Sequence, residues 1–490
     1  KIRGNSMAIK INFDNSFSNL PNKFYYKIFP EKTKSPNLII LNQNLCNELN
    51  LDYKDLSSSE GVNFLSGNSV LKNSNPLAMV YAGHQFGNWV PQLGDGRALL
   101  LGEVIAKNNV RYDIQLKGSG RTPYSRGGDG KAWLGPVIRE YLVSEYMNKI
   151  NIPTTRSLSA ITTGDKVFRE TELPGAILCR VAKSHIRVGT FQYFYSREDT
   201  KSLKILADYF IKNHFPNLEK KENKYFELFK NVVDGQIDLV AKWMKVGFIH
   251  GVMNTDNTSI SCETIDYGPC AFIDNYKSDK VFSSIDSMGR YCYKNQPNIL
   301  MWNMACFATT LVPLLEGTEE KKVDILQKEI SSISEKYKNK WLLEFSKKIG
   351  LKKIYQENEV LINRFLEILE SENLDFTNSF RGLIKEAENS NELISKTDAF
   401  KSWKNDWKKL IKNKSNQKEV CKTITSNNPA FIMRNHLVEQ IIQELLTDKK
   451  DTLNKALVCI EKPFEKIKHY EKMYVGPTKE QEVLRTFCGT

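Results

Sequence analysis

The sequence predicts an α+β protein in two parts, a strand-rich first part and a mainly helical second part. Up to about Phe191, glycine, proline and short alternating apolar runs indicate strands joined by tight turns. From about Ser202 onward, apolar residues recur at three- and four-residue spacing, which is typical of helices. The clearest helical segments are residues 203–214, 224–246, 298–315 and 320–348. We therefore place a first lobe at residues 7–195 and a helical second lobe at residues 196–490.

Length and cysteine content favour a globular, cytoplasmic protein. At 490 residues and 41% hydrophobic, the chain can bury a large core and is too long for one compact domain. Its nine cysteines are scattered without a Cys-x-x-Cys pair, which argues against a zinc site and against a secreted disulfide framework. No apolar run approaches the ~18 residues of a spanning helix, so no membrane partner is expected. We expect residues 1–6, before Met7, to be a cloning remnant.

The chain carries a formal net charge of +13, from 70 Lys and Arg against 57 Asp and Glu. Such an excess is compatible with a nucleic-acid partner, an acidic substrate or no specific partner. The excess is mostly lysine in the polar stretches 319–353 and 401–418, without an arginine stripe interleaved with aromatic residues. We interpret these stretches as solvated helix faces, and we expect no nucleic-acid partner.

His250 begins a segment that has the outline of a protein-kinase catalytic loop with one part changed. On this outline Asn257 takes the place of the metal-binding Asn, and Asp266, which is followed by Tyr-Gly, takes the place of the second metal ligand. Amide and carboxylate oxygens are ligands that Mg²⁺ or Mn²⁺ takes together with phosphates. Val252 falls where the catalytic Asp belongs, and valine accepts no proton. Either the chain is an inactive kinase, or a different phosphoryl chemistry uses another base, for which Asp256 is the candidate.

The surroundings of this loop are also predictable. Residues 248–250 are expected to end a helix, and residues 259–261 to form a short strand before Asp266. His250 is interpreted as a structural residue that hydrogen-bonds the loop backbone, rather than as a base or metal ligand.

A glycine-rich turn lies at Gly94-Asp-Gly96-Arg97, between two predicted strands. Such a turn lets backbone N–H groups approach a phosphate, and Arg97 adds a forked donor. Taken alone, however, an Asp-Gly pair is an ordinary hairpin turn.

Lys117 ends a predicted strand at residues 112–117, on the polar face opposite Ile114 and Leu116. A helix opens at Gly135-Pro136 and carries Glu140, a plausible partner for Lys117 in the lysine–glutamate pair of kinases. The Gly/Ser/Arg-rich residues 121–131, which include Asp129 and Gly130, form a loop suited to lie over an anion.

Arg180 and Arg187 lie in the otherwise apolar segment 179–190. Arginine is seldom buried without an anionic partner. Structural salt bridges and an anionic ligand explain the pair equally well.

Several long strings in the chain resemble the selenoprotein O family, the pseudokinase-like protein adenylyltransferases. These strings occupy residues 81–87, 93–97, 116–126, 152–158, 250–257, 266–269, 289–291, 295–297 and 428–429. The resemblance implies a protein-kinase-like bilobal fold, with family-specific extensions, that binds ATP inverted, so that the α-phosphate meets the acceptor. It also implies a role for each matching residue: nucleotide binding for Gly94, Gly96, Arg97, Lys117, Asp129, Gly130, Arg180 and Arg187, pairing with Lys117 for Glu140, metal binding for Asn257 and Asp266, and proton acceptance for Asp256.

The reaction implied is transfer of AMP from ATP to a Ser, Thr or Tyr hydroxyl of an acceptor protein, with Mg²⁺ or Mn²⁺ and release of pyrophosphate. The alternatives are uridylyl transfer from UTP with Mn²⁺, γ-phosphate transfer by a kinase, and a non-catalytic nucleotide-binding protein. Cys488 lies where family members carry a selenocysteine or cysteine, a candidate redox residue. The resemblance also implies a regulatory disulfide in some members, between this cysteine and one near the metal loop. In this chain the position of that second cysteine is occupied by Phe282, while Cys270 and Cys292 are nearby in sequence. This departure puts a regulatory disulfide in doubt.

Overall fold

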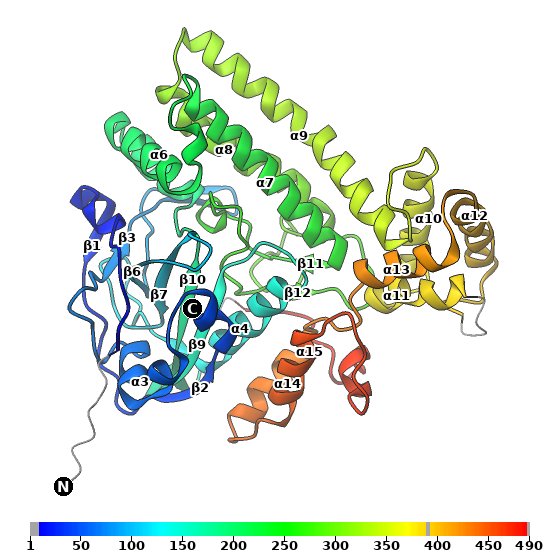
Figure 1. Ribbon diagram of the computed structural model, residues 1–490, viewed down its shortest axis with the longest axis horizontal. Helices are drawn as coiled ribbons and strands as arrows, with labels where there is room; N and C mark the ends of the chain where they lie inside the picture. The colour runs from blue at the N-terminus through cyan, green and yellow to red at the C-terminus, as the bar shows by residue number, and fades with distance from the viewer. Residues whose placement is uncertain (1–8, 389–392, 488–490) are drawn as a thin grey trace.

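The computed structural model describes residues 9–388 and 393–487, and Cys488 and the expected remnant at residues 1–6 lie outside them. The predicted α+β class is confirmed, because an eight-stranded sheet occupies the first part of the chain and helices dominate after it (Figure 1). None of the helices in the described ranges combines the length and apolar content needed to cross a bilayer.

The large sheet is antiparallel throughout. Its strand order is β1-β3-β6-β7-β10-β9-β2, with β8 paired to β10. The strands are β1 (Tyr25–Lys27), β2 (Asn37–Leu41), β3 (Leu77–Met79), β6 (Ala98–Ile105), β7 (Arg111–Lys117), β8 (Ala132–Trp133), β9 (Arg156–Phe168) and β10 (Glu172–Ala182). A separate two-stranded sheet is formed by β4 (Gly83–Gln85) and β5 (Asn88–Val90).

Helices cover the two faces of the sheet differently. On one face, Ile114 and Leu116 share a buried apolar cluster with side chains of three short helices, as the predicted alternation in β7 requires. Those helices are α1 (Gln43–Glu48), α2 (Tyr53–Ser57) and α3 (Ser59–Leu65). Against the other face lies α4 (Leu134–Lys149), which contacts β9 and β10. Gln115 faces this second side and is buried, so the polar face of β7 lies inside the molecule instead of in solvent.

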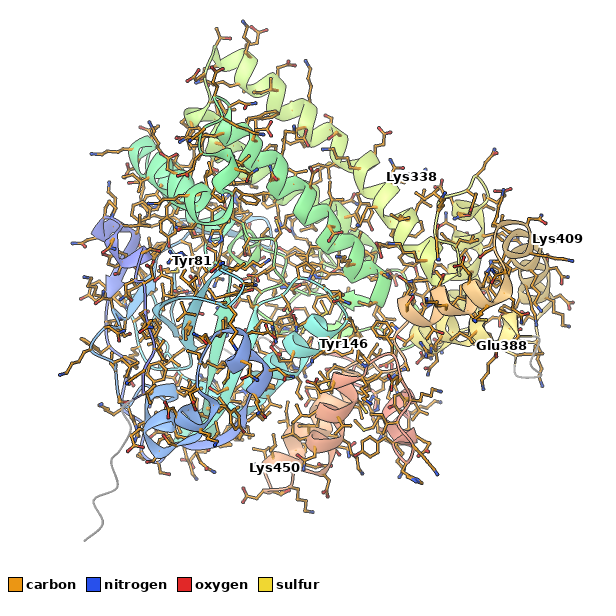
Figure 2. The ribbon with its side chains drawn as sticks, viewed as in Figure 1. Tyr81, Tyr146, Lys338, Glu388, Lys409 and Lys450 are labelled. Atoms are coloured by element: carbon orange, nitrogen blue, oxygen red, sulfur yellow. The ribbon has the colours of Figure 1, made fainter. Side chains whose placement is uncertain are left out.

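Helix α4 also contacts the C-terminal helices. Arg139 donates a hydrogen bond to Asn435 Oδ1 (2.5 Å) and forms an ion pair with Glu439. Tyr146, further along α4, donates its hydroxyl to the carbonyl of Phe431 at 2.7 Å (Figure 2). The helix therefore connects the sheet to the last third of the chain.

The second part of the chain is built from helices, several of which match the predicted segments. Residues 224–246 were predicted without error as α7. The helices are α5 (Val188–Tyr195), α6 (Thr200–His214), α7 (Lys224–Val246), α8 (Gln296–Leu311), α9 (Glu319–Lys348), α10 (Asn358–Ser371), α11 (Phe376–Ala387), α12 (Asp398–Lys414), α13 (Gln417–Asn427), α14 (Asn435–Leu445) and α15 (Asp451–Glu461).

The lysine-rich helices behave as the charge pattern predicts. Trp403 and Trp407 of α12 are buried, whereas Lys409 on the same helix is exposed. Lys338 of α9 is exposed as well, and both lysines lie at the outer edge of the molecule (Figure 2). The predicted solvated faces are confirmed for these helices.

Three local predictions were wrong. Helix α7 ends at Val246, and Gly247, with φ +71°, turns the chain into the short strand β11 (Phe248–Ile249), which pairs with β12 (Ala271–Phe272). Residues 259–261 form no strand, because Ser259 makes only an isolated bridge to Arg187. The turn at residues 94–97 does not close a hairpin, since β5 pairs with β4 and β6 belongs to the large sheet.

Candidate active site

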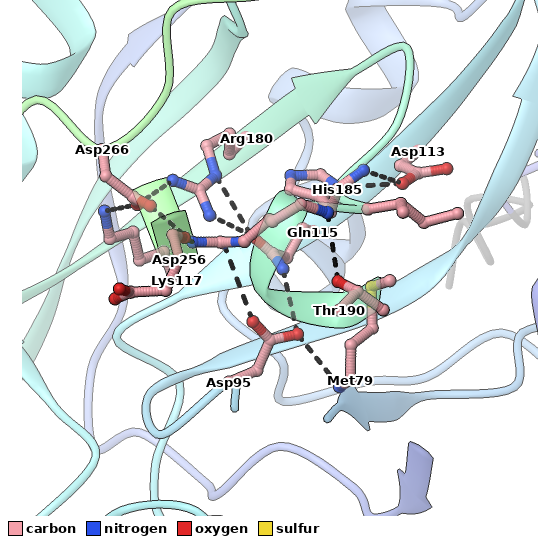
Figure 3. Close-up of polar contacts among 12 residues, drawn as sticks. Met79, Asp95, Asp113, Gln115, Lys117, Arg180, His185, Thr190, Asp256 and Asp266 are labelled. Carbon is pink, nitrogen blue, oxygen red and sulfur yellow. Dashed lines mark hydrogen bonds and ion pairs between the residues drawn. The ribbon is translucent and has the colours of Figure 1, made fainter. Parts of the chain in front are cut away.

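A cavity of about 750 Å³ opens between the large sheet, α4 and the loop that follows β11. Every described residue that the sequence predicts for the site lines this cavity. They are Gly94, Gly96, Arg97, Lys117, Asp129, Gly130, Glu140, Arg180, Arg187, Asp256, Asn257 and Asp266. The fold therefore brings together distant segments of the sequence, for example Lys117 and Asp266, which are 149 positions apart (Figure 3).

Lys117, Glu140 and Asp266 form the inner end of the cavity. Lys117 Nζ lies 2.6 Å from Glu140 Oε2 and 3.1 Å from Asp266 Oδ1. Lys117 comes from the end of β7 and Glu140 from α4, so the pair joins the sheet to the helix packed on it. Burial lowers the pKa of Lys117, although both neighbouring carboxylates favour its charge.

Two buried arginines, Arg180 and Arg187, complete this inner end, and Figure 3 shows Arg180 beside Asp266. Arg180 donates to Asp266 Oδ1 (2.7 Å) and to Glu140 Oε1 (3.0 Å). Its other donors go to Gln115 Oε1, at 3.0 and 2.7 Å. Arg187 donates to Asp266 Oδ2 (2.6 Å). Both arginines thus form salt bridges and also line the cavity, so the two interpretations left open by the sequence are compatible.

Asp266 is bound by three cations at once. Although burial opposes its charge, Arg187, Arg180 and Lys117 hold the pKa of Asp266 well below its ordinary value. Its backbone adopts φ +63°, a left-handed conformation that is uncommon for residues other than glycine. The surrounding cations therefore favour the ionised form of Asp266, which lies in a strained turn.

Asp256 lies in the short 3₁₀ turn η4 (Thr255–Asn257) and has different surroundings. Its Oδ2 accepts a hydrogen bond from Gln85 Nε2 at 3.1 Å. Its Oδ1 is buried and has no hydrogen-bond partner within the described ranges. Burial raises the pKa of Asp256 to about 6, and the hydrogen bond from Gln85 opposes this rise only in part.

Asn257 and His250 stabilise the same loop from inside. Asn257 Nδ2 donates to the Val252 carbonyl at 3.0 Å, which leaves the amide oxygen as the group available to a metal ion. His250 Nε2 lies 2.7 Å from the Ile265 carbonyl, and its Nδ1 accepts from Val252 N at 3.3 Å. The ring stacks on Trp243. The interpretation of His250 as a structural residue is confirmed.

The glycines around the cavity are required by close packing. A Cβ on Gly94, which has φ +125°, would lie 2.6 Å from the ring of Tyr124, and one on Gly96 would lie 2.8 Å from the Tyr124 carbonyl. A Cβ on Gly130 would overlap the backbone of Gly120. The missing Cβ atoms let the turn at residues 94–97 approach the loop 121–131, and Thr122 donates its hydroxyl to the Asp95 carbonyl at 2.6 Å. Both segments line the cavity.

Asp129 lines the cavity, but its carboxylate is already engaged. It binds Arg169 Nη1 at 2.9 Å and accepts from Lys131 N at 2.9 Å. Arg169 comes from the turn between β9 and β10 and also lines the cavity. No sequence pattern points to Arg169, because Asp129 and Arg169 meet only through the fold.

Sequence reasoning missed other residues at the inner end. Asp95, between the two glycines, is buried and accepts from Met79 N at 3.0 Å (Figure 3). Tyr81 lies under the guanidinium of Arg187, at 4.6 Å from ring centroid to Cζ. Gln115 holds Arg180, and Gln85 contacts Asp256. Tyr81 and Gln85 both lie in the string 81–87, which contributes to the family resemblance but indicates no role for either residue.

The end of the described chain lies beside the loop after Asp266. Thr486 donates its hydroxyl to the Pro269 carbonyl (2.6 Å) and its backbone N–H to the Phe282 carbonyl (2.7 Å). Cys270 and Cys292 are buried. Cys488 lies outside the described residues, so its pairing stays a question for experiment.

Comparisons with known proteins identify the family of the chain. A family model described as "Protein adenylyltransferase SelO" matches residues 7–461. The protein nucleotidyltransferase YdiU of Bacillus cereus (strain G9842) is 47% identical over 481 residues, 98% of each chain. The protein of the same name from Anoxybacillus flavithermus (strain DSM 21510 / WK1) is 48% identical over 484 residues, 98% of this chain and 99% of that one. The chain therefore belongs to the SelO family of protein nucleotidyltransferases.

Proposed function

We propose that this protein transfers AMP from ATP to a Ser, Thr or Tyr hydroxyl of an acceptor protein. The observation that carries the proposal is the pair Val252 and Asp256. A kinase needs a carboxylate where this chain has Val252, and that side chain is buried and apolar. Both Val252 and Asp256 line the cavity, and of the two only Asp256 carries a carboxylate. The loop thus keeps a base, four positions later than in a kinase, which supports a changed reaction rather than an inactive enzyme.

In the proposed reaction, the acceptor hydroxyl attacks the α-phosphorus of ATP in line with the leaving group. A bond forms between the hydroxyl oxygen and the α-phosphorus, and the bond from that phosphorus to the oxygen bridging the α- and β-phosphates breaks. The hydroxyl proton passes to the carboxylate of Asp256, and pyrophosphate departs with the bonding electrons. With its pKa raised to about 6, Asp256 is ionised at neutral pH yet more basic than an ordinary aspartate.

Lys117, Arg180 and Arg187 would bind the phosphate chain. Glu140 holds Lys117, and Asp266 holds both Arg180 and Arg187, each within hydrogen-bond distance. The positions of the three cations are therefore set before ATP binds. Donors fixed in this way stabilise charge that develops in the transition state, because no reorganisation is needed at the moment of reaction. Arg97 and the loop 121–131 lie at the outer wall, where they would hold the rest of the nucleotide.

The donor set near Asp266 fits a divalent metal that arrives with the nucleotide. Within the described ranges, no group of three or more His, Cys, Asp or Glu residues could hold a metal ion alone. Asn257 presents an amide oxygen and Asp266 a carboxylate, and Mg²⁺ is commonly bound by one or two such groups plus phosphate oxygens and water. When bound, Mg²⁺ or Mn²⁺ would neutralise charge on the phosphates.

We also infer a kinase-like bilobal arrangement, with lobes at residues 7–195 and 196–490, from the family membership and from the position of the cavity. In this arrangement Lys117 and Glu140 belong to the first lobe and the loop with Asp256 and Asp266 to the second. ATP, acceptor proteins and a cytoplasmic location are part of the same proposal.

Intact-mass analysis after incubation with an acceptor-rich lysate fraction, Mg²⁺ or Mn²⁺ and one nucleotide at a time tests the reaction. ATP labelled at the α-phosphate is expected to label protein, and ATP labelled at the γ-phosphate is not. A gain the size of phosphate would show a kinase. A mass gain equal to UMP, with more modified protein from UTP and Mn²⁺ than from ATP, would show uridylyl transfer. Binding of ATP with no modified product in any fraction would show a non-catalytic protein.

A further inference from the structure

The small sheet of β4 and β5 packs directly against the turn that carries Asp256. Three consecutive residues of β4 and the adjoining turn each hydrogen-bond to a residue of the loop 254–256. The bonds join His84 N to Thr255 Oγ1 (2.7 Å), Gln85 Nε2 to Asp256 Oδ2 (3.1 Å) and Phe86 N to Asn254 Oδ1 (3.0 Å). Tyr291 OH also donates to Asn254 Oδ1, at 2.6 Å. The loop is therefore bonded to three successive residues of β4 and its turn.

The Asp256 side chain also packs closely against two glycines, Gly83 of β4 and Gly189 of α5. A Cβ on Gly83 would lie 2.5 Å from Asp256 Oδ1, and a Cβ on Gly189 would lie 3.2 Å from Asp256 Cα. The carboxylate therefore occupies space that any other residue at position 83 would fill. Because Oδ1 has no hydrogen-bond partner in the described part of the chain, the contact from Gln85 to Oδ2 is what fixes the rotation of the carboxylate.

We propose that Gln85 is a positioning residue that orients the Asp256 carboxylate toward the acceptor hydroxyl. This inference rests on the proposed function, in which Asp256 accepts the proton. The choice of an amide has a physical reason. A Lys or Arg at this position would fix the carboxylate equally well, but its positive charge would make Asp256 a weaker base. The amide of Gln85 fixes orientation without supplying a counter-charge.

The test compares Gln85→Leu with a matched control in α5 that hydrogen-bonds to the same strand. Leucine keeps approximate size but donates no hydrogen bond. The control is Gln192→Leu, which removes a hydrogen bond from Gln192 to the His84 ring (2.9 Å) and does not touch Asp256. Gln85→Leu is expected to lower kcat for nucleotidyl transfer about tenfold to a hundredfold, with KM for ATP unchanged. Gln192→Leu is expected to keep kcat within about threefold of the wild type.

Gln85→Glu serves as a second variant, because it is isosteric and guards against misfolding of the leucine variant. It also lacks the N–H donor and is expected to lower kcat at least as much. ATP binding by calorimetry, unchanged in both variants, would show that the cavity is intact. Equal losses of kcat in the Gln85 and Gln192 variants would overturn the inference, because they would indicate general loosening of the strand. So would a wild-type kcat in Gln85→Leu.

A double-mutant cycle separates this inference from the proposed function. If Gln85 acts through Asp256, Gln85→Leu should cost less than about twofold in an Asp256→Asn background, where the carboxylate is already absent. A full additional loss in that background would assign Gln85 a separate role and overturn the positioning inference alone. Wild-type activity in Asp256→Asn by itself would instead contradict the proposed function.

Discussion

Asp256 and Asp266 are buried carboxylates that line the same cavity, yet the chain surrounds them in opposite ways. Burial opposes the charge of both. Around Asp266, three cations outweigh burial and hold its pKa well below the ordinary value. Around Asp256, burial outweighs the neutral amide of Gln85, which donates to the carboxylate, and Arg187, which donates to the backbone carbonyl at 2.7 Å. Burial therefore raises the pKa of Asp256 to about 6.

This contrast separates two chemical roles. A carboxylate that is always ionised and surrounded by cations suits metal and phosphate binding, whereas one with a raised pKa suits proton transfer near neutral pH. The environment of each residue, more than its type, therefore supports the proposed division between ligand and base. The following changes test that division.

The largest effect is expected from Asp266→Ala. The change removes a proposed metal ligand and the shared partner of Lys117, Arg180 and Arg187. Loss of one preorganised charged group often costs about 10²–10³ in rate, and here several groups lose their position together. Transfer should fall by more than about a thousandfold in a labelling assay with α-labelled ATP. Labelling of acceptor protein at the wild-type level would contradict the role of Asp266.

Asp256→Asn should have a smaller and more selective effect. Asparagine keeps the shape of the side chain but cannot accept the proton, and general-base catalysis typically contributes about 10²–10⁴ in rate. We expect kcat to fall about a hundredfold while ATP affinity, measured by calorimetry, changes by less than threefold. A parallel loss of ATP affinity would place Asp256 among the binding residues and weaken the contrast with Asp266.

The two positions should also differ in their effect on stability. Asp266→Asn leaves three buried cations short of a counter-charge, and breaking a buried pair in this way costs roughly 3–5 kcal/mol. Asp256→Asn removes a poorly solvated charge and should leave the free energy of unfolding unchanged or slightly higher. Urea denaturation at pH 8 measures both. Equal destabilisation by the two variants would show that the surroundings do not differ as described.

The pH dependence of kcat/KM tests the raised pKa of Asp256. Only the ionised carboxylate accepts a proton, so activity should be present above pH 6 and decline about tenfold per unit as the pH falls below about 6. The pH dependence of kcat/KM reports the pKa values of groups in the free enzyme. Residual activity of Asp256→Asn should lack this decline, and an unchanged acid limb in that variant would assign it to another group.

The smallest effect is expected from a substitution of Glu263. This residue is buried outside the cavity and serves as a control for the effect of burial on a carboxyl group. Burial raises the pKa of Glu263 to about 7, above its ordinary 4.5. A raised carboxyl pKa stabilises the folded state at low pH, and this contribution is lost as the pH rises from about 4.5 through 7. Glu263→Gln should therefore be more stable than the wild type at pH 8, by roughly 2–3 kcal/mol at most, and should lose this advantage near pH 5. Thermal unfolding at both pH values decides.

Much of the site was predictable because its residues follow spaced motifs. The spacing from His250 to Asn257, with the later Asp266, predicted the position of the catalytic loop. Helix periodicity predicted α7 and most of α9. A strand lysine followed by a helix glutamate was enough to expect the contact between Lys117 and Glu140. In each case the pattern is local, and the fold needed only to bring the pieces together.

The remainder depended on contacts that no local pattern encodes. Gln85 meets Asp256 across 171 positions, and Asp129 meets Arg169 across 40. The turn at residues 94–97 was expected to join two paired strands, but β5 pairs with β4, so the turn connects two sheets. Alternation in β7 identified its polar face correctly, yet could not show that α4 would bury that face.

Neighbouring residues of α4 face in different directions. Glu140 points to Lys117 and Arg180, whereas Arg139 reaches Asn435 and Glu439 of α14. A rotation of α4 about its axis would therefore move both contacts at once. The contacts with α14 therefore restrain the rotation of α4 and, with it, the distance between Lys117 and Glu140. Substitutions in α14, far from the cavity in sequence, would then change the alignment of the phosphate-binding groups without altering any of them.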